Sequence, residues 1–181
     1  MPNCYSIKAI KSVLEERGLA LNRKLGQNLL FDKNIARKVV SNLGLRGQDT
    51  VVEIGAGMGA LTNLIAGNCS RFFVFEIDRG FFDLLSGDFG SMPGVALLNK
   101  DFLGYDISGL GAVLKVISNL PYYISSPILL KLAGHHEQIN LCVLTMQYEV
   151  ARRITAAEGS SDYSALTVFT RFFFEPVFLF R

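Results

Sequence analysis

A buried-strand sequence that runs into closely spaced glycines and then into a helix constrains the fold of this chain more than any other feature. The segment is residues 51–60, VVEIGAGMGA. Glycines in such a turn let the chain bend sharply and let a ligand approach the backbone, while the next helix offers N–H groups at its N-terminus. The spacing Gly55-x-Gly57-x-x-Ala60 satisfies the fingerprint of dinucleotide-binding proteins. The segment therefore predicts a site for a nucleoside-bearing cofactor.

The rest of the chain indicates one α/β domain with a mostly parallel central sheet and helices on both faces. Half of the 181 residues are hydrophobic, and beyond Thr50 short apolar runs alternate with helical stretches, as in βαβ units. Strands are predicted near residues 50–54, 72–77, 95–99, 113–118 and 141–146. Helices are predicted near 60–66, 81–86 and 127–132, the last capped by Ser126, and another begins near Tyr148. Residues 166–174 predict a further strand, which turns at Glu175-Pro176 into 177–180.

Charge divides the chain into two parts. Residues 1–46 contain nine Lys or Arg and three acidic residues, whereas residues 47–181 contain nine basic and thirteen acidic residues. We expect residues 1–46 to form a basic helical leader within the same domain as a core at 47–181. Ser6 and Asp32 are predicted to cap its two helices, which a loop at residues 21–28 joins.

Cysteine usage and hydropathy exclude several classes of protein. Cys4, Cys69 and Cys142 are odd in number and include no Cys-x-x-Cys, so neither a disulfide framework nor a zinc site is expected. A reducing, cytoplasmic setting fits this pattern best. The first twenty residues lack the apolar core of a secretory signal, and no apolar run reaches the roughly 20 residues that span a bilayer. We expect neither a membrane association nor a metal.

Two acidic residues follow predicted strands. Glu76 lies 21 residues after Gly55, where an acid would bind ribose hydroxyls. Asp101 ends the third predicted strand, where it could accept a hydrogen bond from an adenine amine, with Phe102 available to stack on the ring. Taken alone, Asp101 is more typical of a loop or a helix cap.

The sequence Asn119-Leu120-Pro121-Tyr122 follows the fourth predicted strand, and ligands of open α/β sheets bind at strand C-termini. It resembles the [DNS]-[ILP]-P-[YFW] motif of methyltransferases that modify exocyclic amino groups of nucleobases. The nitrogen of such an amine gains positive charge as it attacks a methyl group. The Asn119 side-chain oxygen and the backbone carbonyl of Leu120 or Pro121 could accept its hydrogens, as fixed dipoles that stabilise this charge. Pro121 would keep the loop rigid, and Tyr122 would stack on the extruded base.

At this point the chain resembles one family, the rRNA adenine N6,N6-dimethyltransferases of the kasugamycin-sensitivity type. The resemblance covers nearly the whole chain, through residues 25–30, 53–62, 76–78, 119–126 and 146–151. It implies the Rossmann-like fold of class I S-adenosylmethionine-dependent methyltransferases. It also implies that the substrate is two adjacent adenosines in the 3′-terminal hairpin loop of small-subunit rRNA, methylated during ribosome biogenesis.

The family pattern also implies roles for single residues. Asn28 and Leu30 would contact the methionine end of S-adenosylmethionine, Gly55 would line its pocket, Glu76 would hold the ribose and Asp101 the adenine. Asn119 would orient the target amine beside the cofactor. Gly57 belongs to the same glycine turn. The partner would be small-subunit rRNA or an immature small subunit, with the basic leader placed to meet phosphate, and we expect a monomer.

The chain departs from the family pattern in three ways. Ala56 stands where the family often has Pro, and Tyr123 where it often has Asn. The usual continuation after Phe180, with an F-x-P-P-P segment and a small helical domain that grips rRNA, is missing. We therefore expect a C-terminally truncated core that binds the cofactor and methylates weakly or not at all.

Three alternatives remain open. The erythromycin-resistance class uses the same chemistry on one large-subunit adenine, although Asn119-Leu120 and Met146-Gln147-x-Glu149 favour the small-subunit family. A nicotinamide dehydrogenase would use the glycine fingerprint but leaves residues 119–122 unexplained. A non-catalytic rRNA-binding assembly factor could share the scaffold, against which the intact Asn119 and Glu76 argue.

Overall fold

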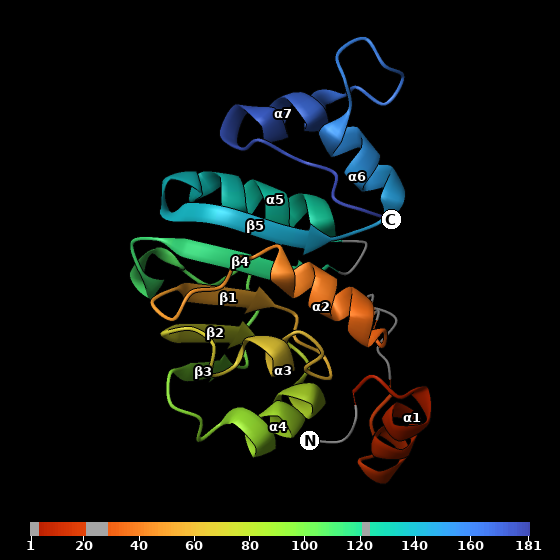
Figure 1. Ribbon diagram of the computed structural model, residues 1–181, viewed down its shortest axis with the longest axis vertical. Coiled ribbons are helices and arrows are strands. Elements are labelled where there is room, and N and C mark those ends of the chain that lie inside the picture. Colours follow the sequence, from red (N-terminus) through yellow and green to blue (C-terminus); the bar gives the residue numbers. More distant parts are fainter. Residues whose placement is uncertain (1–3, 21–28, 121–123) are drawn as a thin grey trace.

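The computed structural model describes residues 4–20, 29–120 and 124–181, and its centre is a parallel sheet of five strands (Figure 1). Each neighbouring pair is parallel, in the order β3-β2-β1-β4-β5. The strands are β1 (Thr50–Ile54), β2 (Arg71–Phe75), β3 (Val95–Leu98), β4 (Leu114–Asn119) and β5 (Ile139–Thr145). The strand order reverses between β1 and β4, and ligands of such sheets bind at this switch point. The expected parallel α/β architecture is confirmed.

Seven α-helices surround this sheet in the described part of the chain: α1 (Ile7–Glu16), α2 (Lys33–Ser41), α3 (Thr62–Ile65), α4 (Arg79–Phe89), α5 (Ser125–Gly134), α6 (Tyr148–Thr155) and α7 (Ala165–Phe173). The predicted caps of the leader are confirmed, since Ser6 Oγ accepts from the Ala9 N–H and Asp32 Oδ1 from the Asn34 and Ile35 N–H groups. The predicted cap Ser126 is wrong: α5 begins at Ser125, and its N-cap Ile124 makes no side-chain cap bond.

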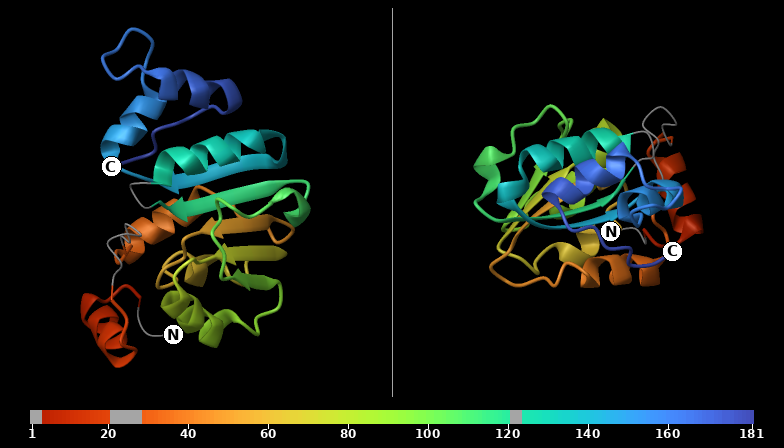
Figure 2. Two further views of the ribbon diagram at one scale, coloured as in Figure 1. Left: turned by 180° about the vertical axis from the view of Figure 1, so that it is seen from behind. Right: turned by 90° about the horizontal axis from the view of Figure 1, so that it is seen from above.

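Two apolar cores lie on the two faces of the sheet, because successive residues of a strand point to opposite sides. Val51 belongs to a core with residues of α2, α3 and α4, such as Val39, Ile65 and Leu85. Val52 belongs to the other core, where residues of α5 such as Ile128 meet the strands. Figure 2 shows α2 and α3 on the face opposite α5. Strands covered on both faces are typical of parallel sheets, which explains their continuous apolar sequences.

A third, smaller core attaches the leader helix α1. Cys4 and Ile10 pack with Met58, Phe81 and other residues of the glycine turn and α4. Tyr5 Oη donates to the carbonyl of Ala60, 2.5 Å away. The leader therefore contacts the turn that the sequence singled out as the ligand site.

Residues 166–174, predicted as a strand, instead form the helix α7. Their β-branched and aromatic side chains are typical of strands, but packing against neighbouring elements overrides that preference. Ser164 and Thr167 form a capping box, and the buried Thr167 and Thr170 face α6 and α5 at helical spacing. Thr167 Oγ1 also donates to the Arg153 carbonyl of α6.

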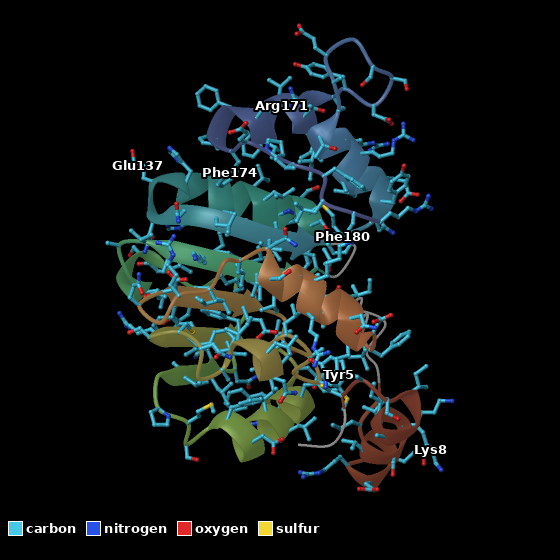
Figure 3. The ribbon with its side chains drawn as sticks, in the orientation of Figure 1. Tyr5, Lys8, Glu137, Arg171, Phe174 and Phe180 are labelled. Carbon is cyan, nitrogen blue, oxygen red and sulfur yellow. The ribbon has the colours of Figure 1, made fainter. Side chains whose placement is uncertain are left out.

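The segment after α7 contains no strand either, although residues 177–180 were predicted to form one. It returns across the fold to α2, where Phe180 joins the core on that face (Figure 3). The Lys38 ammonium lies 3.9 Å from the centre of the Phe180 ring. The guanidinium carbon of Arg181 lies 4.2 Å from the centre of the Tyr148 ring. These cation–π contacts hold the segment without backbone pairing.

No helix in residues 4–20, 29–120 or 124–181 is long and apolar enough to cross a membrane. The same residues contain no group of three or more His, Cys, Asp or Glu side chains that could hold a metal ion.

A partly buried ion pair joins β4 to the connection between α2 and β1. Lys115 Nζ donates to Asp49 Oδ2 at 2.7 Å and to the Gly44 carbonyl at 2.8 Å. Burial alone would raise the pKa of Asp49, but hydrogen bonds from Lys115 and the Arg46 N–H outweigh it and hold that pKa below its ordinary value. The ionised pair therefore stabilises the fold at neutral pH.

We expect Asp49→Asn to lower the free energy of unfolding by about 1.5–3 kcal/mol at pH 7, the range for a charge-assisted hydrogen bond. The Asp49 pKa is depressed in the folded state, so its contribution is complete above the unfolded-state value of about 3.9 and is lost below it. Urea unfolding between pH 7 and pH 3 checks this. Asp83→Asn, which removes an exposed ion pair with Arg79, is the control and should change stability by less than about 1 kcal/mol.

Candidate active site

The candidate site is a pocket at the C-terminal ends of β1 and β4, where the strand order reverses. Four of the predicted site residues line it: Leu30, Gly55, Gly57 and Asn119. They come from three separate parts of the sequence. The full lining within the described part of the chain is Leu29, Leu30, Glu53, Gly55, Ala56, Gly57, Met58, Ala60, Leu61 and Asn119. The lining therefore combines apolar side chains with the glycine backbone, the Glu53 carboxyl and the Asn119 carboxamide.

The floor of the pocket is the glycine turn after β1. Gly55 has φ of 71° and Gly57 has φ of 54°, a left-handed conformation that other residues rarely adopt. A β-carbon built at Gly55 would meet nothing within 4 Å. The Gly55 N–H donates to the Phe75 carbonyl at 2.8 Å, which holds the turn against the end of β2. The backbone is therefore bare and fixed at the place predicted for close approach of a ligand.

Glu76, directly after β2, supports this turn through its side chain. Oε2 accepts from the Gly57 N–H at 2.7 Å, and Oε1 accepts from the Asp78 N–H at 2.9 Å. The residue is 5% exposed, and this burial raises its pKa against the opposing effect of the two N–H donors. A carboxylate has about four acceptor positions, so two N–H donors leave it able to accept hydroxyl groups as well.

Glu53 is a pocket residue to which the sequence analysis gave no role. Its Oε2 accepts from the Thr62 hydroxyl at 2.7 Å, and the side chain is fully buried. This burial, together with the nearby charge of Glu76, raises the pKa of Glu53 to about 8. The carboxyl is therefore mostly neutral at pH 7. A lone acidic residue inside a continuous apolar strand was the sequence signal that could have singled it out.

Asn119 is the last residue of β4, and it lines the same pocket as the glycine turn. Its Oδ1 accepts from the Thr145 hydroxyl at 2.5 Å, and the next N–H, of Leu120, donates to the Thr145 carbonyl at 3.0 Å. The Leu120 side chain is buried in the core, so only its backbone is available to a ligand. Asn28, Pro121 and Tyr122, also predicted as site residues, lie outside the described residues.

Asp101 lies after β3, on the same edge of the sheet, but it does not line the pocket. Its Oδ1 accepts from the Leu103 N–H at 2.9 Å, as in a turn. The expectation that Phe102 stacks on a ligand ring is wrong. Its ring is buried in the core, where it packs edge-on against Phe75 with ring centres 5.2 Å apart.

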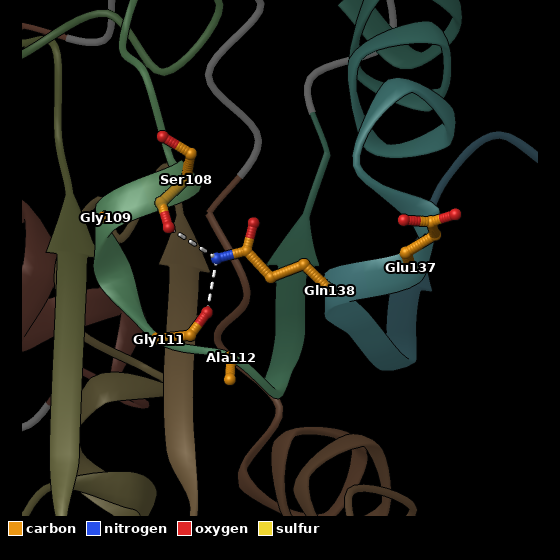
Figure 4. A pocket seen from close by; sticks show the side chains of 6 residues that line it. All are labelled: Ser108, Gly109, Gly111, Ala112, Glu137 and Gln138. Atoms are coloured by element: carbon orange, nitrogen blue, oxygen red, sulfur yellow. Dashed lines mark hydrogen bonds between the residues drawn. The ribbon is translucent and has the colours of Figure 1, made fainter.

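A second, shallow depression lies at the other end of the sheet and has a structural role (Figure 4). The side chain of Gln138 donates there to the carbonyls of Ile107, Ser108 and Gly111. These three bonds hold the loop that leads into β4 and satisfy the carboxamide. The depression contains none of the predicted site residues.

The architecture is the Rossmann-like fold of class I methyltransferases: a parallel sheet with a glycine turn after β1, an acid after β2 and an Asn-Leu pair at the end of β4. The family model described as ribosomal RNA adenine dimethylase matches residues 18–180. The chain belongs to this family.

Curated relatives agree with that assignment. The chain is 36% identical over 171 residues to ribosomal RNA small subunit methyltransferase A of Shouchella clausii, covering 91% of this chain and 58% of that protein. It is 39% identical over 165 residues to the protein of the same name from Chlorobium luteolum, covering 90% of this chain and 59% of that one. The chain thus spans somewhat less than two thirds of the length of these relatives.

Solved structures show the same fold. A dimethyladenosine transferase from Plasmodium falciparum is similar with a TM-score of 0.70 and 26% identity, over 77% of this chain and 50% of that one. The 23S rRNA methyltransferase ErmE is similar with a TM-score of 0.69 and 27% identity, over 78% of this chain and 56% of that one.

We expect Glu53→Gln to become more stable relative to the unsubstituted protein as pH rises. The folded-state pKa of Glu53 is raised to about 8, so folding must protonate this carboxyl above its unfolded-state pKa of about 4.3, and stability falls from there up to about pH 8. The amide keeps an oxygen for Thr62 without this cost. Urea unfolding should show a relative gain of more than about 1 kcal/mol between pH 4.5 and pH 8. A difference independent of pH would contradict the neutral state of Glu53.

Proposed function

We propose that this chain is the catalytic domain of an enzyme that transfers methyl groups from S-adenosylmethionine to N6 of two adjacent adenosines in the 3′-terminal hairpin loop of small-subunit rRNA. One observation carries the proposal: the Asn119 carboxamide and the glycine turn face the same pocket. The curated relatives named small subunit methyltransferase A support the choice of rRNA.

The residues present fit the proposed cofactor. Gly55 leaves backbone bare beside the pocket, Glu76 has acceptor positions for ribose hydroxyls, and Leu29, Leu30 and Met58 supply apolar surface. When bound, S-adenosylmethionine supplies an electrophilic methyl group on a positively charged sulfur. We further propose that Asn28 contacts its methionine end and that Asp101 accepts from its adenine amine.

Asn119 would act on the target base. The lone pair of an adenine N6 amine is delocalised into the ring, so the amine is a weak nucleophile, and positive charge grows on nitrogen as the bond to carbon forms. The Asn119 oxygen and the carbonyl of Leu120 or Pro121 would each accept one N6 hydrogen. These dipoles are held by the fold before the reaction, so they stabilise the charge without reorganisation. Tyr122 would stack on the extruded base.

We propose that the enzyme is a monomer, that it acts in the cytoplasm, and that it binds an immature small ribosomal subunit. The basic leader supports this, because α2 carries Lys33, Arg37 and Lys38, and such residues bind RNA phosphate. The three cysteines are free thiols, which supports a reducing compartment.

A second candidate is methylation of a large-subunit adenine, since ErmE is as similar in fold as the dimethyladenosine transferase. The sequence identity of 36–39% to small-subunit enzymes favours the first candidate. Family membership gives the dehydrogenase alternative no support.

We expect Glu76→Gln to weaken S-adenosylmethionine binding at least tenfold, because the amide nitrogen takes the place of one of the two oxygens that accept from the Gly57 and Asp78 N–H groups. Isothermal titration calorimetry measures this. Asp83→Asn, an exposed acid on α4, should bind as the unsubstituted protein does. Unchanged affinity in Glu76→Gln, or heat of binding with NAD, would contradict the cofactor site.

We expect Asn119→Ala to lower the methyl-transfer rate roughly 100-fold, as for other fixed dipoles that stabilise reaction charge. Single-turnover transfer of labelled methyl groups, with protein in excess over purified small or large subunits, measures the rate, and nuclease digestion identifies N6-methylated adenosine. Cofactor affinity should change less than in Glu76→Gln. Label in large subunits alone would favour the second candidate, and an Asn119→Ala rate equal to that of the unsubstituted protein would contradict the role of Asn119.

A further inference from the structure

Thr145 is the last residue of β5 and lies directly opposite Asn119, the last residue of β4, in the parallel pairing of the two strands. Its hydroxyl donates to Asn119 Oδ1 at 2.5 Å, and its carbonyl accepts from the Leu120 N–H at 3.0 Å. Thr145 thus contacts both the Asn119 carboxamide and the backbone N–H of the next residue. The sequence analysis assigned Thr145 no role.

A carboxamide at a strand end needs such a partner to hold one orientation. The last torsion of an asparagine side chain is broad and roughly two-fold, so rotation can exchange the places of Oδ1 and Nδ2. The two atoms have opposite hydrogen-bonding roles, since oxygen accepts and nitrogen donates. An Asn119 turned by half a rotation would therefore present a donor where a reacting amine requires an acceptor.

The last two residues of β4, Ser118 and Asn119, each form a side-chain hydrogen bond with a different neighbouring strand. Ser118 Oγ donates to the Ile54 carbonyl of β1 at 2.5 Å, and the Thr145 hydroxyl of β5 donates to Asn119. The backbone bond from Leu120 to Thr145 is formed without the hydroxyl. Strand pairing therefore does not require the Thr145 side chain, and the hydroxyl acts on the carboxamide alone.

We propose that Thr145 is a positioning residue, whose hydroxyl orients the Asn119 carboxamide so that its oxygen accepts from the N6 amine of the target base. The inference rests on the proposed function of Asn119. A carboxamide oxygen has two acceptor positions, so a hydrogen bond from Thr145 does not by itself exclude one from the base. Thr145 is β-branched, which restricts its own rotamers and gives the hydroxyl a defined direction.

The first test measures the order of the Asn119 side chain in the protein without RNA. Thr145→Val removes the hydroxyl and keeps the shape, whereas Thr145→Ser keeps the hydroxyl. The side-chain amide signal of Asn119, assigned by its loss in Asn119→Ala, is followed by nitrogen relaxation. We expect its order parameter to fall from about 0.8 to below about 0.6 in Thr145→Val and to stay high in Thr145→Ser. Equal order in Thr145→Val and the unsubstituted protein would overturn the proposal.

The second test measures transfer to small subunits. We expect Thr145→Val to lower kcat roughly five- to tenfold, the effect of one lost hydrogen bond, with the RNA KM and the cofactor Kd changed less than about twofold. In an Asn119→Ala background the same substitution should have no further effect, because Thr145 acts through Asn119. Thr145→Ser should restore kcat.

The matched control is Thr155→Val, which removes the hydroxyl of another half-buried threonine, bonded to the Ala151 carbonyl on α6. It should leave kcat unchanged. A loss of kcat by Thr145→Val that persists in the Asn119→Ala background, or that Thr145→Ser does not restore, would overturn the positioning role. If the unsubstituted protein neither binds S-adenosylmethionine nor methylates ribosomal RNA, the proposed function fails, while the relaxation measurement still decides whether Thr145 orders Asn119.

Discussion

The hydrogen bond from the Gly57 N–H to the Glu76 carboxylate is the contact on which the organisation of the site depends. It joins the turn after β1 to the residue after β2 and keeps the left-handed glycine backbone in one place. Because the strands are parallel, their C-terminal ends meet at one edge, and Asn119 of β4 reaches the same pocket. The bond thus sets the position of the pocket floor relative to the acceptor that lies across it.

The surroundings of Glu53, which lines the pocket, and of Glu76, which supports the glycine turn, give the two acids different roles. Glu53 lies inside β1, where its carboxyl accepts from the Thr62 hydroxyl, and burial favours the neutral form. Glu76 lies one residue beyond β2, where two backbone N–H groups oppose the effect of burial on its pKa. The neutral acid is therefore part of the packing beneath the turn, and the acid at the strand end is the one suited to hydroxyl groups of a ligand.

The local parts of the site could be predicted because each depends on neighbouring residues. A strand, a glycine turn and a helix are contiguous in residues 51–60, and Glu76 follows the next apolar run. The helix α7 could not be predicted in this way, because its strand-like side chains are held by α6 and α5. The prediction that Phe102 stacks on a ligand was wrong for a related reason. Its position next to Asp101 does not reveal that its ring packs against Phe75.

The sequence by itself determined the α/β class, the family resemblance and the identity of the groups that could do chemistry, since these depend on residue type and spacing along the chain. Only the tertiary structure decided which groups meet. The contact between Thr145 and Asn119 depends on the register of β4 against β5, and the neutral state of Glu53 depends on the helices that exclude water from it. Register and burial arise from contacts between residues far apart in the chain, so no local pattern encodes them.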